Sequence, residues 1–422
     1  MTQNDFDGTI NGMSTTKASL LNTTLRWFLL AMILANVGSE MVFALLALYL
    51  SELGASVGQI GLTFTVAALV PLALQIFGGW LSDSIGRLRT IAIGSVAASF
   101  GYVLLPLAPS WQWALLALCL EYIAGSMVGP SFGAFIADQS AEENRGRVFG
   151  LTKGIFLTVA VIGPLLGGFL AQRFGFRPML LTAAALYVSA SVLRVWMATT
   201  ARFARGVATE RPTWRSLRAG MGSMIGMLAA GGVLTWVLLT DGVRDVAFGL
   251  SGELQPLYLA QIGHLDVQQI GWLRALLGAA MIVATFLAGW LSDRSGERRV
   301  IAGGFFLQFL SLVVFLRATD VLGFAASALI FGLGIGTMIP AYDALISKVV
   351  PEERRGIAFG LFGTSLGLIS LPAPWIGAQL WERFSPRLPF ALTAAAVLLS
   401  VIPAWTKFVL PDKEEEPSRR LA

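Results

Sequence analysis

The sequence predicts an all-α integral membrane protein in which twelve transmembrane helices form two pseudo-symmetric six-helix bundles. The 422 residues are 55% hydrophobic and only 13% charged, whereas a soluble domain carries about 25% charged residues. The apolar residues form runs of about 20 or more, the length at which a helix crosses the hydrocarbon core. The two halves also repeat each other at a fixed offset, which predicts two copies of one bundle in parallel orientation.

The apolar runs place the predicted helices and divide the chain. In the first half they lie near 25–50, 57–82, 90–108, 111–137, 146–172 and 178–200. In the second half they lie near 231–259, 268–292, 300–317, 321–347, 356–381 and 388–409. We therefore expect a cytoplasmic tail at 1–24, a first bundle at 25–200, a cytoplasmic linker or interfacial segment at 201–230, a second bundle at 231–409 and a cytoplasmic tail at 410–422.

The repeat is visible as identical residues 210 positions apart. The segment GWLSD occurs at 79–83 and again at 289–293, and Gln59-Ile60-Gly61 recurs as Gln269-Ile270-Gly271. Leu48-Tyr49-Leu50 recurs at 257–259, at an offset of 209. Hydropathy alone places the seventh helix at 219–240, but the repeat places it at 231–259. We follow the repeat, because hydropathy penalises the charges that a functional site needs.

Basic residues are distributed unevenly between the two sides of the predicted helices. The loops on the GWLSD side carry fifteen Arg and Lys residues and the opposite loops carry five. The positive-inside rule then places GWLSD, both termini and the linker in the cytoplasm of a multi-pass protein of the cell (inner or plasma) membrane. The same arginines account for the net charge of +5, so we expect no nucleic-acid partner.

The loop between the second and third predicted helices carries a recognisable pattern of glycines and charges. It reads Gly79-x-Leu81-x-Asp83-x-x-Gly86-Arg87-x-Arg89 and resembles the signature loop of the major facilitator superfamily. The resemblance covers about residues 25–408. It implies secondary active transport by alternating access, without ATP and without an enzymatic step. It also implies that the loops latch the cytoplasmic side closed. The second copy and two repeated arginines complete the expected latch: Gly289, Asp293, Gly296, Arg299, Arg145 and Arg355, with Glu297 in the place of Arg87.

The fifth predicted helix carries a second pattern of small residues. Gly154, followed by Gly163-Pro164-Leu165-Leu166-Gly167-Gly168, resembles the antiporter motif of the 12-helix drug:proton antiporter branch. Small residues permit close helix contact and the proline bends the helix. The fourth helix departs from that branch, because Glu121 stands where the branch has an arginine. Proton coupling therefore cannot simply be carried over from the resemblance.

Several ionisable or polar residues lie inside the predicted helices. A charge at the bilayer centre costs about 2.5–3.5 kcal/mol by insertion scales, so such residues suggest functional sites. Glu40 and Glu121 have no basic neighbour in the sequence and suit a proton or a cationic substrate. Arg244 has acidic neighbours at i−3 and i+1, which predicts an internal ion pair. The candidates for proton or substrate binding are Asn36, Glu40, Glu121, Asp241, Arg244, Asp245 and Arg274.

These patterns favour a secondary active transporter that exports amphipathic or cationic small molecules in exchange for protons. Two alternatives stay open: an uptake symporter for a small metabolite or organic anion, with Arg244 and Arg274 as anion ligands, and a lipid or lysolipid flippase. The chain has one histidine and one cysteine and no Walker phosphate loop, so we expect no metal, no cofactor and no enzymatic activity. The expected partners are a small-molecule substrate, protons and the lipid bilayer, with the protein acting as a monomer.

Overall fold

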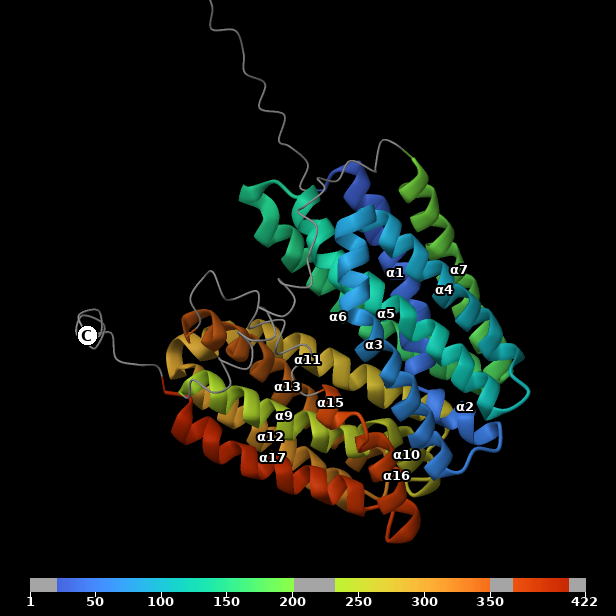
Figure 1. Cartoon of the computed structure of the whole chain (residues 1–422). Coiled ribbons are helices and arrows are strands. Elements are labelled where there is room, and N and C mark those ends of the chain that lie inside the picture. Colours follow the sequence, from blue (N-terminus) through green and yellow to red (C-terminus); the bar gives the residue numbers. More distant parts are fainter. Residues whose placement is uncertain (1–20, 201–231, 350–366, 410–422) are drawn as a thin grey trace, which may run out of the picture.

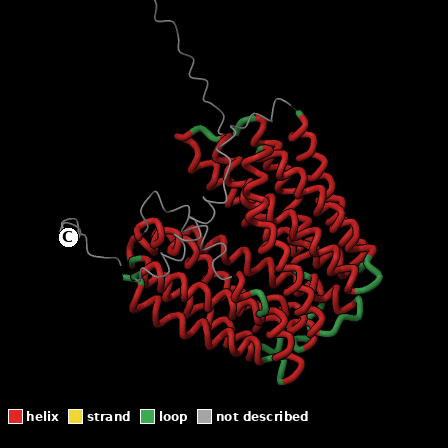
Figure 2. The backbone as a smooth tube through the Cα atoms, viewed as in Figure 1, coloured by secondary structure: helices red, strands yellow, loops and turns green. Residues whose placement is uncertain are grey.

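The computed structural model describes residues 21–200, 232–349 and 367–409, and regular structure in these ranges is entirely helical (Figure 2). The first half contains α1 (Thr23–Phe43), α2 (Leu46–Glu52), α3 (Val57–Ile85), α4 (Arg87–Leu104), α5 (Trp111–Gln139), α6 (Arg145–Phe174) and α7 (Phe176–Thr199). The second half contains α9 (Val233–Ser251), α10 (Gln255–Gln261), α11 (Val267–Ser295), α12 (Glu297–Arg317), α13 (Val321–Val349), α15 (Gly367–Ser370), α16 (Ala373–Arg383) and α17 (Leu388–Lys407).

Each predicted segment has a helical counterpart, although the segment predicted at 356–381 is described only from Gly367. The first predicted helix consists of α1 and α2, and the seventh consists of α9 and α10, so both are interrupted at equivalent places. Helix α9 begins at Val233 and carries Asp241, Arg244 and Asp245 within it, as the repeat predicts. Of the described helices, nine are long and apolar enough to cross a membrane. Helix α9 is not one of the nine, because it carries these three charges.

The helix packing repeats between the halves. In the first half α1 packs against α6 and α7, and α5 packs against α3 and α4. The second half repeats both arrangements, with α9 against α16 and α17, and α13 against α11 and α12. The halves contact each other through two equivalent pairs, α6 with α11 and α3 with α16, and through α2 with α10. Figure 1 shows that the halves meet near α2 and α10 and diverge toward the far ends of α7 and α17. We call the meeting point the α2–α10 end.

The repeated Gln residues stabilise helix starts. Ser56 and Gln59 form a capping box at the start of α3, in which each side chain bonds the backbone of the other residue. Asp266 and Gln269 form the same capping box at the start of α11. Such boxes satisfy N–H groups that the first helical turn otherwise leaves unpaired.

The repeated Gly residues next to these caps permit close contact between the halves. A Cβ atom on Gly61 would lie 2.5 Å from the carbonyl oxygen of Pro374. A Cβ atom on Gly271 would likewise lie 2.5 Å from the carbonyl oxygen of Pro164. Glycine and proline therefore meet twice across the interface, in equivalent positions. This contact gives a physical reason for the repeated Gly61 and Gly271, which are the residues that let the halves close at the α2–α10 end.

Candidate functional site

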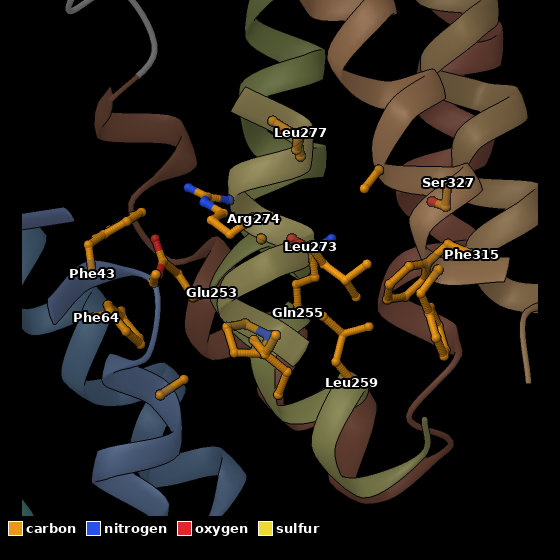
Figure 3. Close-up of a pocket in the computed structure, with 17 residues that line it drawn as sticks. Phe43, Phe64, Glu253, Gln255, Leu259, Leu273, Arg274, Leu277, Phe315 and Ser327 are labelled. Carbon is orange, nitrogen blue, oxygen red and sulfur yellow. The ribbon is translucent and has the colours of Figure 1, made fainter. Parts of the chain in front are cut away.

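A cavity of about 540 Å³ lies where α1 and α6 of the first half meet α9, α11, α12 and α13 of the second half. Glu40 and Phe43 of α1, Glu253 of the short turn between α9 and α10, and Arg274 of α11 all line it. Figure 3 shows an adjoining part of this wall, in which Phe43, Glu253 and Arg274 point toward one another. The remaining wall is largely aromatic and aliphatic, and its rings are Phe43, Phe248, Phe315, Phe331 and Phe390.

Arg274 is the one arginine or lysine among the described residues that line this cavity. Its guanidinium carbon lies 5.7 Å from the centroid of the Phe43 ring, within the range of a cation–π contact. The charge of Arg274 also acts on the carboxyl groups of both Glu40 and Glu253. These two acids sit on different halves of the protein, so the cavity brings together groups that are 213 positions apart in the chain. The lining thus combines two carboxyl groups, one guanidinium and several rings.

A second cavity of about 440 Å³ lies inside the first half, between α1, α4, α5 and α7. The Tyr102 hydroxyl donates a hydrogen bond to Glu121 Oε1 at 2.5 Å. The ring of Tyr102 stacks on Tyr187 with centroids 4.2 Å apart. Asn36 also lines this cavity, and its amide donates to the carbonyl of Met32 in its own helix. Glu121, which has no basic neighbour in the sequence, is therefore held by a tyrosine in a cavity whose wall is mostly apolar.

Arg194 of α7 closes one side of the second cavity. It is 1% exposed and its guanidinium lies 5.9 Å from the Tyr187 ring centroid. Its Nη1 donates to Ser95 Oγ at 2.7 Å and its Nη2 approaches Met32 Sδ at 2.9 Å. Its Nε has no hydrogen-bond partner among the described residues. Arg194 is fixed by these contacts and supplies a buried positive charge to the wall of the cavity that Glu121 also lines.

The charges of α9 form the ion pair that their spacing predicts. Arg244 Nη2 lies 2.8 Å from Asp241 Oδ1 and 3.0 Å from Asp245 Oδ1. Asp241 is 6% exposed, so the pair is largely buried. Because both carboxylates bind the one guanidinium, Arg244 is neutralised within its own helix. The repeat aligns Asp245 with Asn36 of α1 at the offset of 209, but no described contact joins them: Asp245 binds Arg244, and Asn36 donates to the carbonyl of Met32.

Three glycines of the fifth-helix motif lie at close helix contacts. A Cβ atom on Gly163 would meet Glu40, and one on Gly167 would lie 2.8 Å from the carbonyl oxygen of Met41. Gly168 faces Gly271 across the two halves. Gly154 has open space around it, so packing does not require a glycine there. The motif thus positions α6 against α1, directly behind Glu40, and against α11.

The two GWLSD loops contain a turn that favours glycine. Gly86 has φ +97° and Gly296 has φ +78°, a region that other residues rarely adopt. The described residues Arg89, Arg145, Asp293 and Arg299 are exposed, and Gly289 has open space around it. The side chain of Asp83, the surroundings of Gly79 and all of Arg355 lie outside the described residues. The latch across the halves therefore stays a prediction.

Each loop also carries an ion pair within its own half. Arg87 at the start of α4 lies 3.6 Å from Asp138 near the end of α5. The equivalent residues of the second half, Glu297 and Lys348, also pair. The two pairs occupy corresponding positions of the repeat with the charges exchanged. Glu297, which departs from the motif, is thus matched by a partner of the opposite sign.

The exchanged charges of the two ion pairs predict that a second substitution can restore the stability lost by a first. Arg87→Glu places two acids together and is expected to lower the free energy of unfolding by about 0.5–1 kcal/mol, the scale of a partly exposed ion pair. Adding Asp138→Lys reproduces the arrangement of the second half and is expected to restore stability. Thermal unfolding of the purified protein measures both variants, with Glu297→Arg plus Lys348→Asp as the matched double variant. A double variant no more stable than Arg87→Glu would contradict the assignment.

Comparison with known proteins identifies the family. The model of the Major Facilitator Superfamily matches residues 28–252 and 243–422. The chain belongs to the major facilitator superfamily. Solved structures of this superfamily share the fold: a mutant of the nucleoside transporter NupG superposes with TM-score 0.74 at 12% identity, covering 92% of this chain and 100% of that one. A bacterial homologue of the iron transporter ferroportin, in an inward-facing state, superposes with TM-score 0.72 at 18% identity, covering 92% and 99%.

Among major facilitator proteins, the chain is similar in sequence to multidrug transporters. It is 24% identical over 396 residues to the multidrug resistance protein MdtG of Citrobacter koseri, covering 91% of this chain and 94% of the relative. It is 24% identical over 387 residues to the multi-drug resistance efflux pump PmrA homolog of Lactococcus lactis, covering 88% and 92%. Membership of the major facilitator superfamily makes this chain a multi-pass membrane transporter.

Sequence reasoning missed part of the site. It identified Glu40, Glu121 and Arg274, but it did not include Glu253 among the candidates, and it did not connect Glu121 with Tyr102. The interruption between α9 and α10 turns Glu253 toward the cavity. The structure interrupts α1 and α2 at the equivalent place, but the sequence analysis predicted neither interruption.

Proposed function

We propose that this protein exports amphipathic, cationic small molecules in exchange for protons, by alternating access of the cavity between its halves. The observation that carries the proposal is the pair of carboxyl groups, Glu40 and Glu253, in an aromatic cavity whose described lining includes one guanidinium, that of Arg274. Organic cations favour such a combination of ring faces and carboxylates. The similarity to multidrug efflux proteins supports the same direction of transport.

The neutralisation of Arg244 weighs against the alternative of organic-anion uptake. That function would use Arg244 and Arg274 as anion ligands. Arg244 is already bound by Asp241 and Asp245, and Arg274 shares its cavity with two carboxyl groups. An anion placed there would face more negative than positive groups.

We assign the proton to Glu121. Glu121 does not line the cavity that contains Arg274, and no described cation lies within ion-pair distance of its carboxyl group. It can therefore gain or lose a proton without disturbing the substrate. The Tyr102 hydroxyl fixes the orientation of its carboxyl group. In this proposal the protein works as a monomer in the cytoplasmic membrane, with both termini in the cytoplasm and with the α2–α10 end on the outer side.

The experiment is transport by the purified protein in proteoliposomes. We expect Glu121→Gln to remove the stimulation of cation export by an inward proton gradient while leaving cation binding intact, because glutamine keeps the shape and the contact with Tyr102 but carries no proton. Glu52→Gln, at the end of α2, is the matched control and should remain coupled. A Glu121→Gln variant whose export still rises with the proton gradient would disprove the assignment.

A further inference from the structure

We infer that the guanidinium of Arg274 occupies the place that the cationic group of a ligand would take in the cavity of about 540 Å³ between the halves, which we call the central cavity. The ligand that takes this position is an aromatic, monovalent organic cation. It stacks on Phe43 and displaces the guanidinium from the ring face. This inference rests on the proposed function and adds a residue that sets the specificity and affinity of the site.

The first observation is where the guanidinium lies. It is placed over the face of Phe43, and Glu40 and Glu253 belong to the same cavity wall. A ring face together with carboxyl groups is the environment that binds an organic cation. The guanidinium of Arg274 is itself a flat, delocalised cation of the kind that stacks on rings. The protein thus places its own cation where a ligand cation would bind.

The second observation is how loosely Arg274 is held, compared with the other arginines of the helices. Arg194 donates to Ser95 and is buried, and Arg244 is bound by two carboxylates. Arg274 donates no hydrogen bond to a described residue. No described carboxylate oxygen lies within 4.0 Å of its guanidinium nitrogens, the limit for an ion pair. Its contact with Phe43 is therefore weak enough to be exchanged. Its long side chain can swing off the ring and still remain between the two acids.

Charge balance explains why exchange is favourable. With both acids ionised, the described residues of the lining carry a net charge of minus one, because they include two carboxylates and one guanidinium. A monovalent cation brings the cavity to neutrality, and an anion takes it further from neutrality. Charge effects of this kind are strong in a cavity that is mostly apolar. Arg274 therefore limits the affinity for one cation and disfavours a second one.

The test compares two probes of the same shape and opposite charge, tetraphenylphosphonium and tetraphenylborate. Both keep their charge at every pH, so the result does not depend on the proton site. Binding of each probe is measured on the purified full-length protein, for wild type, Arg274→Gln, Arg274→Met and Arg274→Lys. Arg317→Gln, at the exposed end of α12 and outside the cavity, is the control. Thermal unfolding of every variant shows that it is folded.

We expect Arg274→Gln and Arg274→Met to bind tetraphenylphosphonium at least tenfold more tightly than wild type, and tetraphenylborate more weakly. Arg274→Lys keeps the charge but not the flat guanidinium, so it should gain less affinity for the phosphonium than the two neutral variants. Arg317→Gln should match wild type to within about threefold, because it lies outside the cavity. If wild type binds the phosphonium and neither neutral variant binds it more tightly, this inference is wrong and the proposed function stands. Equal increases in affinity for both probes would also overturn the inference, because they would show that the substitution enlarges the cavity and not that it removes a competing charge. If no variant binds the phosphonium, both the inference and the proposed function fail.

Discussion

Glu253→Gln is expected to lower the affinity for monovalent lipophilic cations by about 10–100-fold, because it removes one of the two carboxyl groups of the central cavity. A desolvated charge pair of this kind is worth about 1.5–3 kcal/mol when one partner is removed without a change of shape. Glu40→Gln should have an effect of the same sign, since Glu40 faces the same guanidinium from the other half. Binding of tetraphenylphosphonium, followed by its export from proteoliposomes, measures both variants.

The control for this prediction is Glu142→Gln, an exposed position in the turn between α5 and α6. It should bind and export the cation as wild type does. The double variant Glu253→Gln with Glu40→Gln should lose cation binding altogether, because Arg274 then leaves the cavity positive. Cation affinity that survives in the double variant would place the substrate elsewhere.

Gly271→Leu is expected to stop transport by preventing the halves from meeting at the α2–α10 end. A side chain there would collide with the carbonyl of Pro164, which a single Cβ atom already approaches to 2.5 Å. Overpacking costs about 1–3 kcal/mol, which shifts a two-state equilibrium by about 5–150-fold. Because Gly61 makes the equivalent contact with Pro374, Gly61→Leu should have the same effect.

The chain offers a control on the next helix, α12. Gly303 has open space where its Cβ atom would be, so Gly303→Leu should still transport. A cysteine at Ser327, which lines the cavity, reports the state in a background in which Cys119 is replaced by serine. In Gly271→Leu it should react faster with an impermeant thiol reagent added from the outer side. Normal transport by Gly271→Leu would refute the role given to this contact.

The repeat made most of the fold predictable, and it did so where hydropathy failed. It aligned Leu48-Tyr49-Leu50 with residues 257–259, and so placed Asp241, Arg244 and Asp245 inside a helix, although it did not predict that the first and seventh helices are interrupted. It also singled out Gln59 and Gly61, which cap and pack helices at both equivalent sites. The major facilitator signature added the family, which the comparison confirmed.

The candidate site was less predictable, because the long helices are apolar on nearly every side. An amphipathic helix shows its buried face in the sequence, but a helix that is apolar all round does not. The sequence therefore did not show that Phe43 and Arg274 face each other, nor that Tyr102 reaches Glu121 across two helices. The repeat gave no indication of the site either, because the position equivalent to Arg274 is Phe64, which carries no charge. These groups are specific to one half, and only the packing brings them together.

The exchanged charges at the two GWLSD loops have a consequence for how the chain assembles. Two homologous bundles made in succession on one polypeptide can exchange equivalent helices, a hazard of repeated domains. If α13 took the place of α5, Lys348 would lie against Arg87, and Asp138 would lie against Glu297 in the converse exchange. Both mispaired bundles would bring like charges together, whereas both correct bundles bring opposite charges together. One inverted pair thus gives each half of the duplicated protein a means of rejecting helices of the other during biogenesis.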